Sequence, residues 1–309
     1  MKVEAKVVAD SISPDGVRII TVEGSLYRPV LGELAKHRLL SISAQSSRAV
    51  PVKKMIDMVR NSSMQPVYWG KNQAGMSAKE ELQGEELAKC QRIWNYHANI
   101  TADAMQRLDE IGLHKQLSNR LGEPFSPQRV LITATEWSNF FALRLHKDAQ
   151  PELRVFAECV HKAIQESEPE IVESNDWHLP FVDKELYMTR QIGGDGLPIE
   201  IMRYYVNGSE VDLETAKRYS AARCATTSYR TESISLEKGL EIYQKLVETE
   251  PYHSVPLEHV CRPLYMSRSS SFGFDDLVTH IDREGWCWSG NAKGWGQMRK
   301  EITGSVLCK

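Results

Sequence analysis

The stretch His37-Arg38-Leu39-Leu40-Ser41-Ile42-Ser43-Ala44-Gln45-Ser46-Ser47-Arg48 (HRLLSISAQSSR) gathers a histidine, two arginines and four serines within twelve residues. A phosphate site needs a bidentate guanidinium with hydroxyl and backbone donors close by, and Ser46-Ser47-Arg48 supplies all three consecutively. A solvated loop whose serines cap a helix starting near Val52 would have the same composition. The stretch by itself leaves both interpretations open.

The residues around this stretch predict a mixture of strands and helices. Apolar runs at 3–8 and 17–22 predict two strands joined by a turn at Ser13-Pro14-Asp15-Gly16, and 129–135 predicts a short buried strand. Residues 29–40 are compatible with a short helix or a strand, and 168–208 reads as loop-rich. Helical periodicity is present over 52–60, 77–116 (as one long helix or two), 136–146, 151–167, 211–222 and 236–249.

No linker and no tandem repeat divides the chain, so we expect a single mixed domain over residues 1–309. Its fold class is α/β (α+β), with a central sheet and long helices. The glycine cluster Gly193-Gly194-Asp195-Gly196 lacks the GxGxxG spacing of a dinucleotide-binding turn, so it favours a flexible loop and a fold that is not of the Rossmann type.

Composition excludes several classes of partner. The 309 residues carry a formal net charge of -3, so no global field attracts nucleic acid or an anionic membrane. No apolar run reaches the length of a membrane span. The six cysteines are scattered without metal-site spacing, which predicts no metal and fits reduced thiols in a cytoplasmic protein.

The opening stretch resembles the signature of the flavin-dependent thymidylate synthases, RHRxxSxNxxSxRY. Five positions match: His37, Arg38, Ser41, Ser46 and Arg48. The sequence departs from the signature at Lys36, Ser43 and Ala49, which stand in place of arginine, asparagine and tyrosine.

Three further segments are similar to this family. Residues 136–154 look like its helix-loop-helix, with Asn139 at a flavin-contacting position and Arg144 at an essential arginine. Arg144 also lies among apolar residues, where an arginine needs an anionic partner. Arg120 falls where the family has another arginine that contacts the nucleotide. The alternative is that Arg120 is a solvent-exposed surface residue with no ligand.

The last resemblance lies downstream, in an inverted order. His253-Ser254-Val255-Pro256-Leu257-Glu258-His259 looks like the family's H-x-[ST]-P-F-E-H segment, and Ser220-Ala221-Ala222-Arg223 with Ser228-Tyr229 looks like AARVSY. Most members carry both of these segments before the arginine-rich signature, whereas here both follow it. Residues 1–170 and 211–309 therefore resemble a permuted arrangement of the family. In that arrangement, residues 253–256 are expected to fold back beside His37-Arg38. Taken alone, such histidines would be structural and capped by a carboxylate such as Glu258.

The resemblance implies reductive methylation of dUMP to dTMP with FAD, NADPH and 5,10-methylenetetrahydrofolate, in a cytoplasmic homotetramer with shared active sites. It implies that Arg144 is catalytic. It implies dUMP contacts from Glu33, Ser46, Ser47, Arg48, Arg120 and Arg144. It implies FAD contacts from Lys36, His37, Arg38, Asn139, Ser228 and His253.

The departures from the family pattern leave alternatives open. Glu33 stands where members carry a glutamine, and Ala44 where many carry a glutamate that touches the nucleotide. A flavin- and folate-dependent pyrimidine nucleotide hydroxymethylase is therefore a second hypothesis, and a non-catalytic oligomer that binds flavin or nucleotide is a third. Residues 285–300 fit either a ligand-facing lid or a packed C-terminal element.

Overall fold

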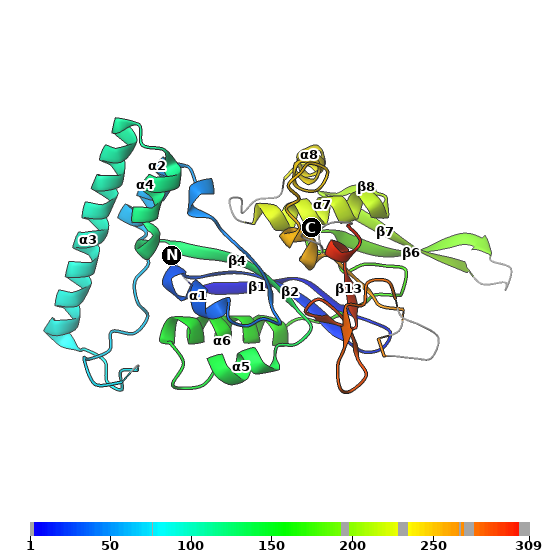
Figure 1. Cartoon of the computed structure of the whole chain (residues 1–309), viewed down its shortest axis with the longest axis horizontal. Helices are drawn as coiled ribbons and strands as arrows, with labels where there is room; N and C mark the ends of the chain where they lie inside the picture. Colours follow the sequence, from blue (N-terminus) through cyan, green and yellow to red (C-terminus); the bar gives the residue numbers. More distant parts are fainter. Residues whose placement is uncertain are drawn as a thin grey trace.

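The computed structural model describes residues 3–75, 77–192, 198–227, 234–265, 267–268 and 275–302. Figure 1 shows a long helix at one end, a sheet through the middle, and a second group of helices and strands at the other end. The mixed α and β class predicted from the sequence is confirmed. Of the helices in these ranges, none is long and apolar enough to cross a membrane.

The central sheet has the strand order β3-β4-β2-β1-β5. Its strands are β1 (Glu4–Ile12), β2 (Arg18–Tyr27), β3 (Ser41–Ala44), β4 (Pro127–Ala134) and β5 (Glu170–Ile171). All neighbours pair antiparallel except β1 with β5. The sheet therefore differs from the parallel, doubly wound sheet of dinucleotide-binding folds.

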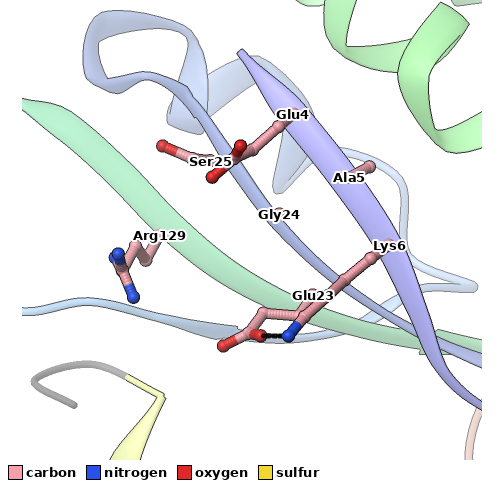
Figure 2. Close-up of a pocket in the computed structure, with 7 residues that line it drawn as sticks. All are labelled: Glu4, Ala5, Lys6, Glu23, Gly24, Ser25 and Arg129. Atoms are coloured by element: carbon pink, nitrogen blue, oxygen red, sulfur yellow. Dashed lines mark ion pairs between the residues drawn. The ribbon is translucent and has the colours of Figure 1, made fainter. Parts of the chain in front are cut away.

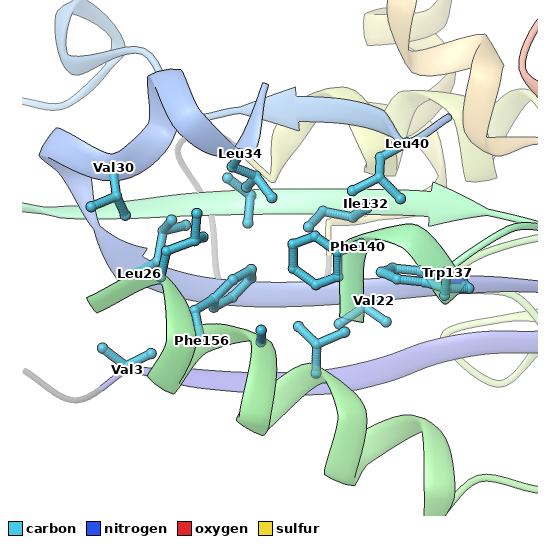
Figure 3. Close-up of a cluster of buried hydrophobic side chains, with 14 of the residues drawn as sticks. Val3, Val22, Leu26, Val30, Leu34, Leu40, Ile132, Trp137, Phe140 and Phe156 are labelled. Atoms are coloured by element: carbon cyan, nitrogen blue, oxygen red, sulfur yellow. The ribbon is translucent and has the colours of Figure 1, made fainter. Parts of the chain in front are cut away.

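Helices α5 (Ser138–Arg144) and α6 (Pro151–Gln165) cover one face of this sheet, where the core lies (Figure 3). Val22 and Leu26 of β2 are completely buried together with Phe156 of α6. Burying an apolar side chain of this size stabilises the fold by about 1.5–3 kcal/mol. Between them, a Cβ on Gly24 would lie 2.6 Å from the Phe156 ring, so the close approach of α6 requires glycine.

Three helices follow the opening stretch and form the end of the molecule at the left of Figure 1: α2 (Val52–Asn61), α3 (Gly84–Ile111) and α4 (Lys115–Leu121). The helical pattern over 77–116 is therefore two helices and begins later than predicted. Gly112 separates them with a φ of 93°, a left-handed conformation that commonly ends a helix.

The prediction of a loop-rich region over 168–208 was wrong. The region contains β6 (Asp183–Ile192) and all of β7 (Pro198–Val206), which pair antiparallel, and β7 also pairs with the following β8 (Ser209–Val211). Leu186, Tyr187 and Met188 are three apolar residues in a row, all exposed, so no alternation of buried and polar residues marks the strand. The glycine cluster at 193–196 lies outside the described residues.

Two helices, α7 (Leu213–Thr226) and α8 (Leu236–Val247), confirm the predictions for 211–222 and 236–249. They are followed by a 3-10 turn, η4 (Val255–His259), and by β9 (Cys261–Pro263). This turn lies against β3 and β4 of the central sheet. The downstream segment is therefore in contact with the sheet that carries the opening stretch.

The C-terminal residues form short strands: β10 (His280–Ile281), β11 (Cys287–Ser289), β12 (Ala292–Lys293) and β13 (Trp295–Gln297). Trp295 is completely buried, and its indole N–H donates to the Val17 carbonyl oxygen at 3.0 Å. Cys287 and Met298 are buried as well. Of the two interpretations of residues 285–300, the structure supports the packed element.

Candidate functional site

Arg144, the last residue of α5, is held in place by two residues that precede β3. Its Nη1 donates to Glu33 Oε2 at 3.2 Å, its Nη2 to the Glu33 carbonyl oxygen at 3.5 Å, and its Nε to His37 Nε2 at 2.9 Å. The Arg144 side chain is 17% exposed. The anionic partner predicted for Arg144 is therefore Glu33. Because a guanidinium has five N–H donors, two remain for a ligand.

The contact with Arg144 fixes the protonation state of His37. Arginine can only donate, so His37 Nε2 must accept, and the ring is neutral with its proton on Nδ1. Burial, followed by the charge of Arg144, lowers the pKa of His37. The ring also packs edge-on against Phe140, with the two centroids 5.1 Å apart.

A cavity of about 250 Å³ opens beside this arginine. Four of the residues expected to contact FAD line it: Lys36, His37, Arg38 and Asn139. The side chains of Lys36 and Arg38 make no ion pair with any other described residue. Leu39 and Leu143 add exposed apolar surface at the rim, 40% and 53% accessible. The cavity therefore combines cations, an amide and apolar side chains.

Ser46, Ser47 and Arg48 lie beyond the other end of β3, where Ser47 opens the 3-10 turn η2 (Ser47–Ala49). The Ser47 hydroxyl donates to Glu123 Oε1 at 2.6 Å. It does not cap α2, whose N-cap residue is Pro51, without a side-chain cap bond. The helix-cap interpretation of the serines was therefore wrong.

Glu123 organises this second group of residues. Its Oε1 also accepts from Arg28 Nη2 at 3.1 Å and lies 3.6 Å from Nη1 of Arg120, whose side chain is 63% exposed. Asn119 donates to the carbonyl oxygens of Ser47 and Val50, both at 2.9 Å, and so fixes the turn. The turn thus leaves the exposed Arg48 and Arg120 on adjoining elements.

Sequence reasoning missed the supporting roles of Arg28, Asn119 and Glu123. Asn119 directly precedes Arg120, and Glu123 follows it by three residues. The available signal was a carboxylate three residues after an arginine, a spacing that favours an ion pair on one helical face. Nothing local indicated that Ser47, 76 residues away, would share this carboxylate.

The structure does not bring all predicted site residues together in one subunit. Along the chain, β3 lies between Ser46–Arg48 and the Arg144 partners Glu33 and His37, and the cavity beside Arg144 is lined by none of Ser46, Ser47 and Arg48. His253 lies in a different cavity, of about 260 Å³, beside Ser43 and Ala44 rather than His37. Ser228 lies outside the described residues.

Two buried histidines connect the downstream half of the chain to the central sheet. His178 Nδ1 lies 2.8 Å from the Ser11 hydroxyl, and its Nε2 lies 2.7 Å from Thr21 Oγ1. Thr21 continues the chain of hydrogen bonds to Thr133 Oγ1 at 2.6 Å. The His178 imidazole thus joins β1 to β2, and the Thr21 hydroxyl extends the chain to β4.

The chain of hydrogen bonds ends at His259. Its Nδ1 lies 2.8 Å from Thr133 Oγ1, and its Nε2 lies 2.8 Å from the Ser43 hydroxyl on β3. The partners of His259 are therefore hydroxyls, not the carboxylate that the alternative, structural interpretation of this segment proposed. Glu258 instead pairs with Arg299.

Both histidines are kept neutral by their surroundings. His178 and His259 are completely inaccessible to solvent, and burial lowers the pKa of each to about 3. A neutral imidazole donates from one nitrogen and accepts at the other, which matches the hydroxyls on either side. The surroundings of both histidines therefore favour the neutral imidazole over the protonated one.

Among the residues that the structure describes, no group of three or more histidine, cysteine or acidic side chains is placed to hold a metal ion. The candidate site described above consists of arginines, a neutral histidine and a cavity. Comparison with known proteins identifies the part of the chain that carries them.

The family model for the thymidylate synthase complementing protein matches residues 19–170. These residues form a flavin-dependent thymidylate synthase family domain. The domain contains Arg144, His37, Arg48 and Arg120, and it ends before both buried histidines. A search of curated proteins found no match.

Two kinds of solved structure are similar to the chain. The UMP/dUMP methylase PolB from Streptomyces cacaoi, bound with 5-Br UMP, is 14% identical, with 53% of this chain and 88% of that chain covered and a TM-score of 0.42. Thymidylate synthase ThyX from Helicobacter pylori, with FAD and dUMP, is 16% identical, with 47% and 67% covered and a TM-score of 0.32. At these scores the assignment of the family domain rests on its sequence.

Proposed function

We propose that this protein is a flavin-dependent thymidylate synthase that converts dUMP to dTMP. Methylenetetrahydrofolate would supply the carbon and NADPH the electrons. The observation that carries the proposal is Arg144: a guanidinium with two unused donors, held by Glu33 and His37 beside a cavity within the family domain.

In this proposal Arg144 binds the uracil ring. One of its two remaining N–H groups would donate to a uracil carbonyl oxygen, and the positive guanidinium would lie against N3, where negative charge develops as the ring is activated. A donor held in place before the reaction stabilises such charge without reorganisation, by about 3 kcal/mol. Glu33 and His37 act as positioning residues, because each occupies one edge of the guanidinium.

The phosphate of dUMP would be bound by Ser46, Ser47, Arg48 and Arg120. The two arginines are exposed and lie on adjoining elements, and the turn offers hydroxyl and backbone donors. The Ser47 hydroxyl is already donated to Glu123, so this serine would contribute its backbone N–H or exchange its partner on binding.

The residues around the cavity fit part of FAD. Lys36 and Arg38 are cations without ion pairs in the described chain, which suits a diphosphate, while Asn139 and the leucine rim suit a ring with polar edges. Bound FAD would supply the hydride chemistry that no side chain can perform. His253 and Ser228 are proposed to complete the flavin site.

We infer that the active site is shared between subunits of a homotetramer. A cavity of about 250 Å³ is smaller than the roughly 300–1,000 Å³ of typical ligand sites, so it would hold one part of the cofactor. The uracil and phosphate groups are also separated by β3 within one chain. We further propose one permuted domain over residues 1–309, with 211–309 replacing the usual N-terminal segment.

Replacing Arg48 with alanine is expected to weaken dUMP binding about tenfold or more, with a smaller effect on turnover at saturating dUMP. The phosphate does not change during the reaction, so its contacts contribute mostly uniform binding. Steady-state kinetics with varied dUMP separates the two parameters. Replacing Arg60, which pairs with Asp103 on the surface, is the matched control. A large loss of turnover with unchanged affinity would contradict the assignment.

The purified protein is expected to be yellow, or to become so with FAD, and to be a tetramer by light scattering. Lys36→Ala and Asn139→Ala should each weaken FAD binding measured by calorimetry, because both line the cavity. Colourless protein without measurable FAD affinity would refute the flavin assignment and leave a non-catalytic oligomer as the better hypothesis.

Mass spectrometry of the product decides between a thymidylate synthase and a pyrimidine nucleotide hydroxymethylase. With dUMP, methylenetetrahydrofolate, NADPH and FAD, a methylated nucleotide is expected. A 5-hydroxymethyl product would instead support the hydroxymethylase, which the departures at Glu33 and Ala44 keep open.

A further inference from the structure

A second polar cavity lies on the central sheet, away from the site described above. Its volume is about 240 Å³, and Figure 2 shows Glu4, Lys6, Glu23, Ser25 and Arg129 around it. Successive side chains of a strand point to opposite faces. Glu23 and Ser25 flank Gly24, whose Cβ direction meets α6, so the cavity is on the face that α5 and α6 leave uncovered.

The strand register places these side chains in two rows. Glu4 of β1 pairs with Ser25 of β2, and Ser25 pairs with Arg129 of β4. In the next row, Lys6 pairs with Glu23. Carboxylate, hydroxyl and guanidinium therefore follow one another across three neighbouring strands.

Two buried atoms in this cavity lack a partner within the described chain. Glu23 is 8% exposed, and its Oε2 binds Lys6 Nζ at 3.0 Å, while its Oε1 makes no hydrogen bond. Ser25 is 4% exposed, and its hydroxyl makes none either. Native proteins pair almost all such groups, so both atoms indicate a ligand that donates hydrogen bonds.

Two of the charged side chains around the cavity also lack an ion-pair partner among the described residues. Lys6 and Glu23 neutralise each other, whereas Glu4 and Arg129 have no ion pair among the described residues. They stand at opposite ends of one row, and neighbouring strands lie roughly 4.8 Å apart, so their backbones are separated by about 10 Å. A molecule between them would meet negative charge on one side and positive charge on the other.

We propose that this cavity binds a small zwitterion of amino-acid size. Its ammonium group donates to Glu23 Oε1, Ser25 and Glu4, and its carboxylate accepts from the Arg129 guanidinium. This arrangement supplies the missing partner of each buried atom and neutralises both unpaired charges. The site is independent of the nucleotide site, which uses other residues.

Isothermal titration calorimetry of the full-length protein tests the proposal with glycine, β-alanine and γ-aminobutyrate, which differ in the separation of their charges. Acetate and methylammonium represent the two halves. At least one zwitterion is expected to bind at least tenfold more tightly than either half. Equal or absent binding of all five probes would overturn the proposal.

Substitutions of residues that line the cavity test whether the zwitterion binds there. Arg129→Gln and Glu23→Gln should each lower the affinity for the tightest-binding zwitterion at least tenfold. FAD affinity should stay unchanged, as evidence of an intact fold. Arg203→Gln replaces a partly buried arginine on β7 and should leave zwitterion affinity unchanged. Unchanged affinity in both Arg129→Gln and Glu23→Gln would place the zwitterion elsewhere and refute this site.

Discussion

Turnover of dUMP is expected to fall about a hundredfold or more when Arg144 is replaced with alanine, even at saturating dUMP. The reason is that the two free donors of Arg144 would face charge that grows only as the pyrimidine is activated, and loss of one such donor typically costs 10²–10³ in kcat. Steady-state and single-turnover kinetics measure this effect directly. FAD affinity should change little, because Lys36, Arg38 and Asn139 remain around the cavity.

Two further measurements separate an activation role from a structural one. Arg154→Ala removes an arginine of α6 that pairs with Glu158, and its turnover should match that of the unsubstituted protein. In Arg144→Ala the pKa of His37 should rise, since the neighbouring positive charge that lowers it is gone. If Arg144→Ala kept normal turnover and lost only apparent dUMP affinity, Arg144 would be a binding residue instead.

The free energy of unfolding is expected to fall by about 4 kcal/mol between pH 7.5 and pH 5. His178 and His259 have pKa values lowered to about 3 in the folded protein, so the unfolded chain binds protons below pH 6.5 that the folded chain cannot. Each pH unit below 6.5 costs about 1.4 kcal/mol per histidine, or about 2 kcal/mol each at pH 5. Urea denaturation at the two pH values, at one protein concentration, measures the difference.

Single substitutions test this origin of acid sensitivity. His259→Gln keeps a donor and an acceptor next to Thr133 and Ser43 but cannot titrate. The decrease in the free energy of unfolding between pH 7.5 and pH 5 should therefore shrink to about 2 kcal/mol. His146, whose side chain is 58% exposed, provides the control, and His146→Gln should retain the full loss. A loss in His259→Gln equal to that of the native protein would show that other groups cause it.

Local pattern was sufficient for the features that depend on neighbours in the chain. The β1–β2 hairpin, the helices α2, α5, α6, α7 and α8, and the family signature around His37 were all readable from the sequence. The need of Arg144 for an anionic partner was readable too, because apolar neighbours make an unpaired guanidinium costly. Periodicity and fixed spacing carry this kind of information without any knowledge of the fold.

Tertiary structure alone decided which residues meet. The partner of Arg144 is Glu33, 111 residues away, and Thr21 binds His178 across 157 residues. The strands β6 and β7 were missed because their exposed apolar side chains give no alternation, and the unpaired row of Glu4, Ser25 and Arg129 exists only through strand register. The charge of a side chain and its free donors depend on burial and on distant partners, so the sequence determined which groups are present and the fold determined what each can do.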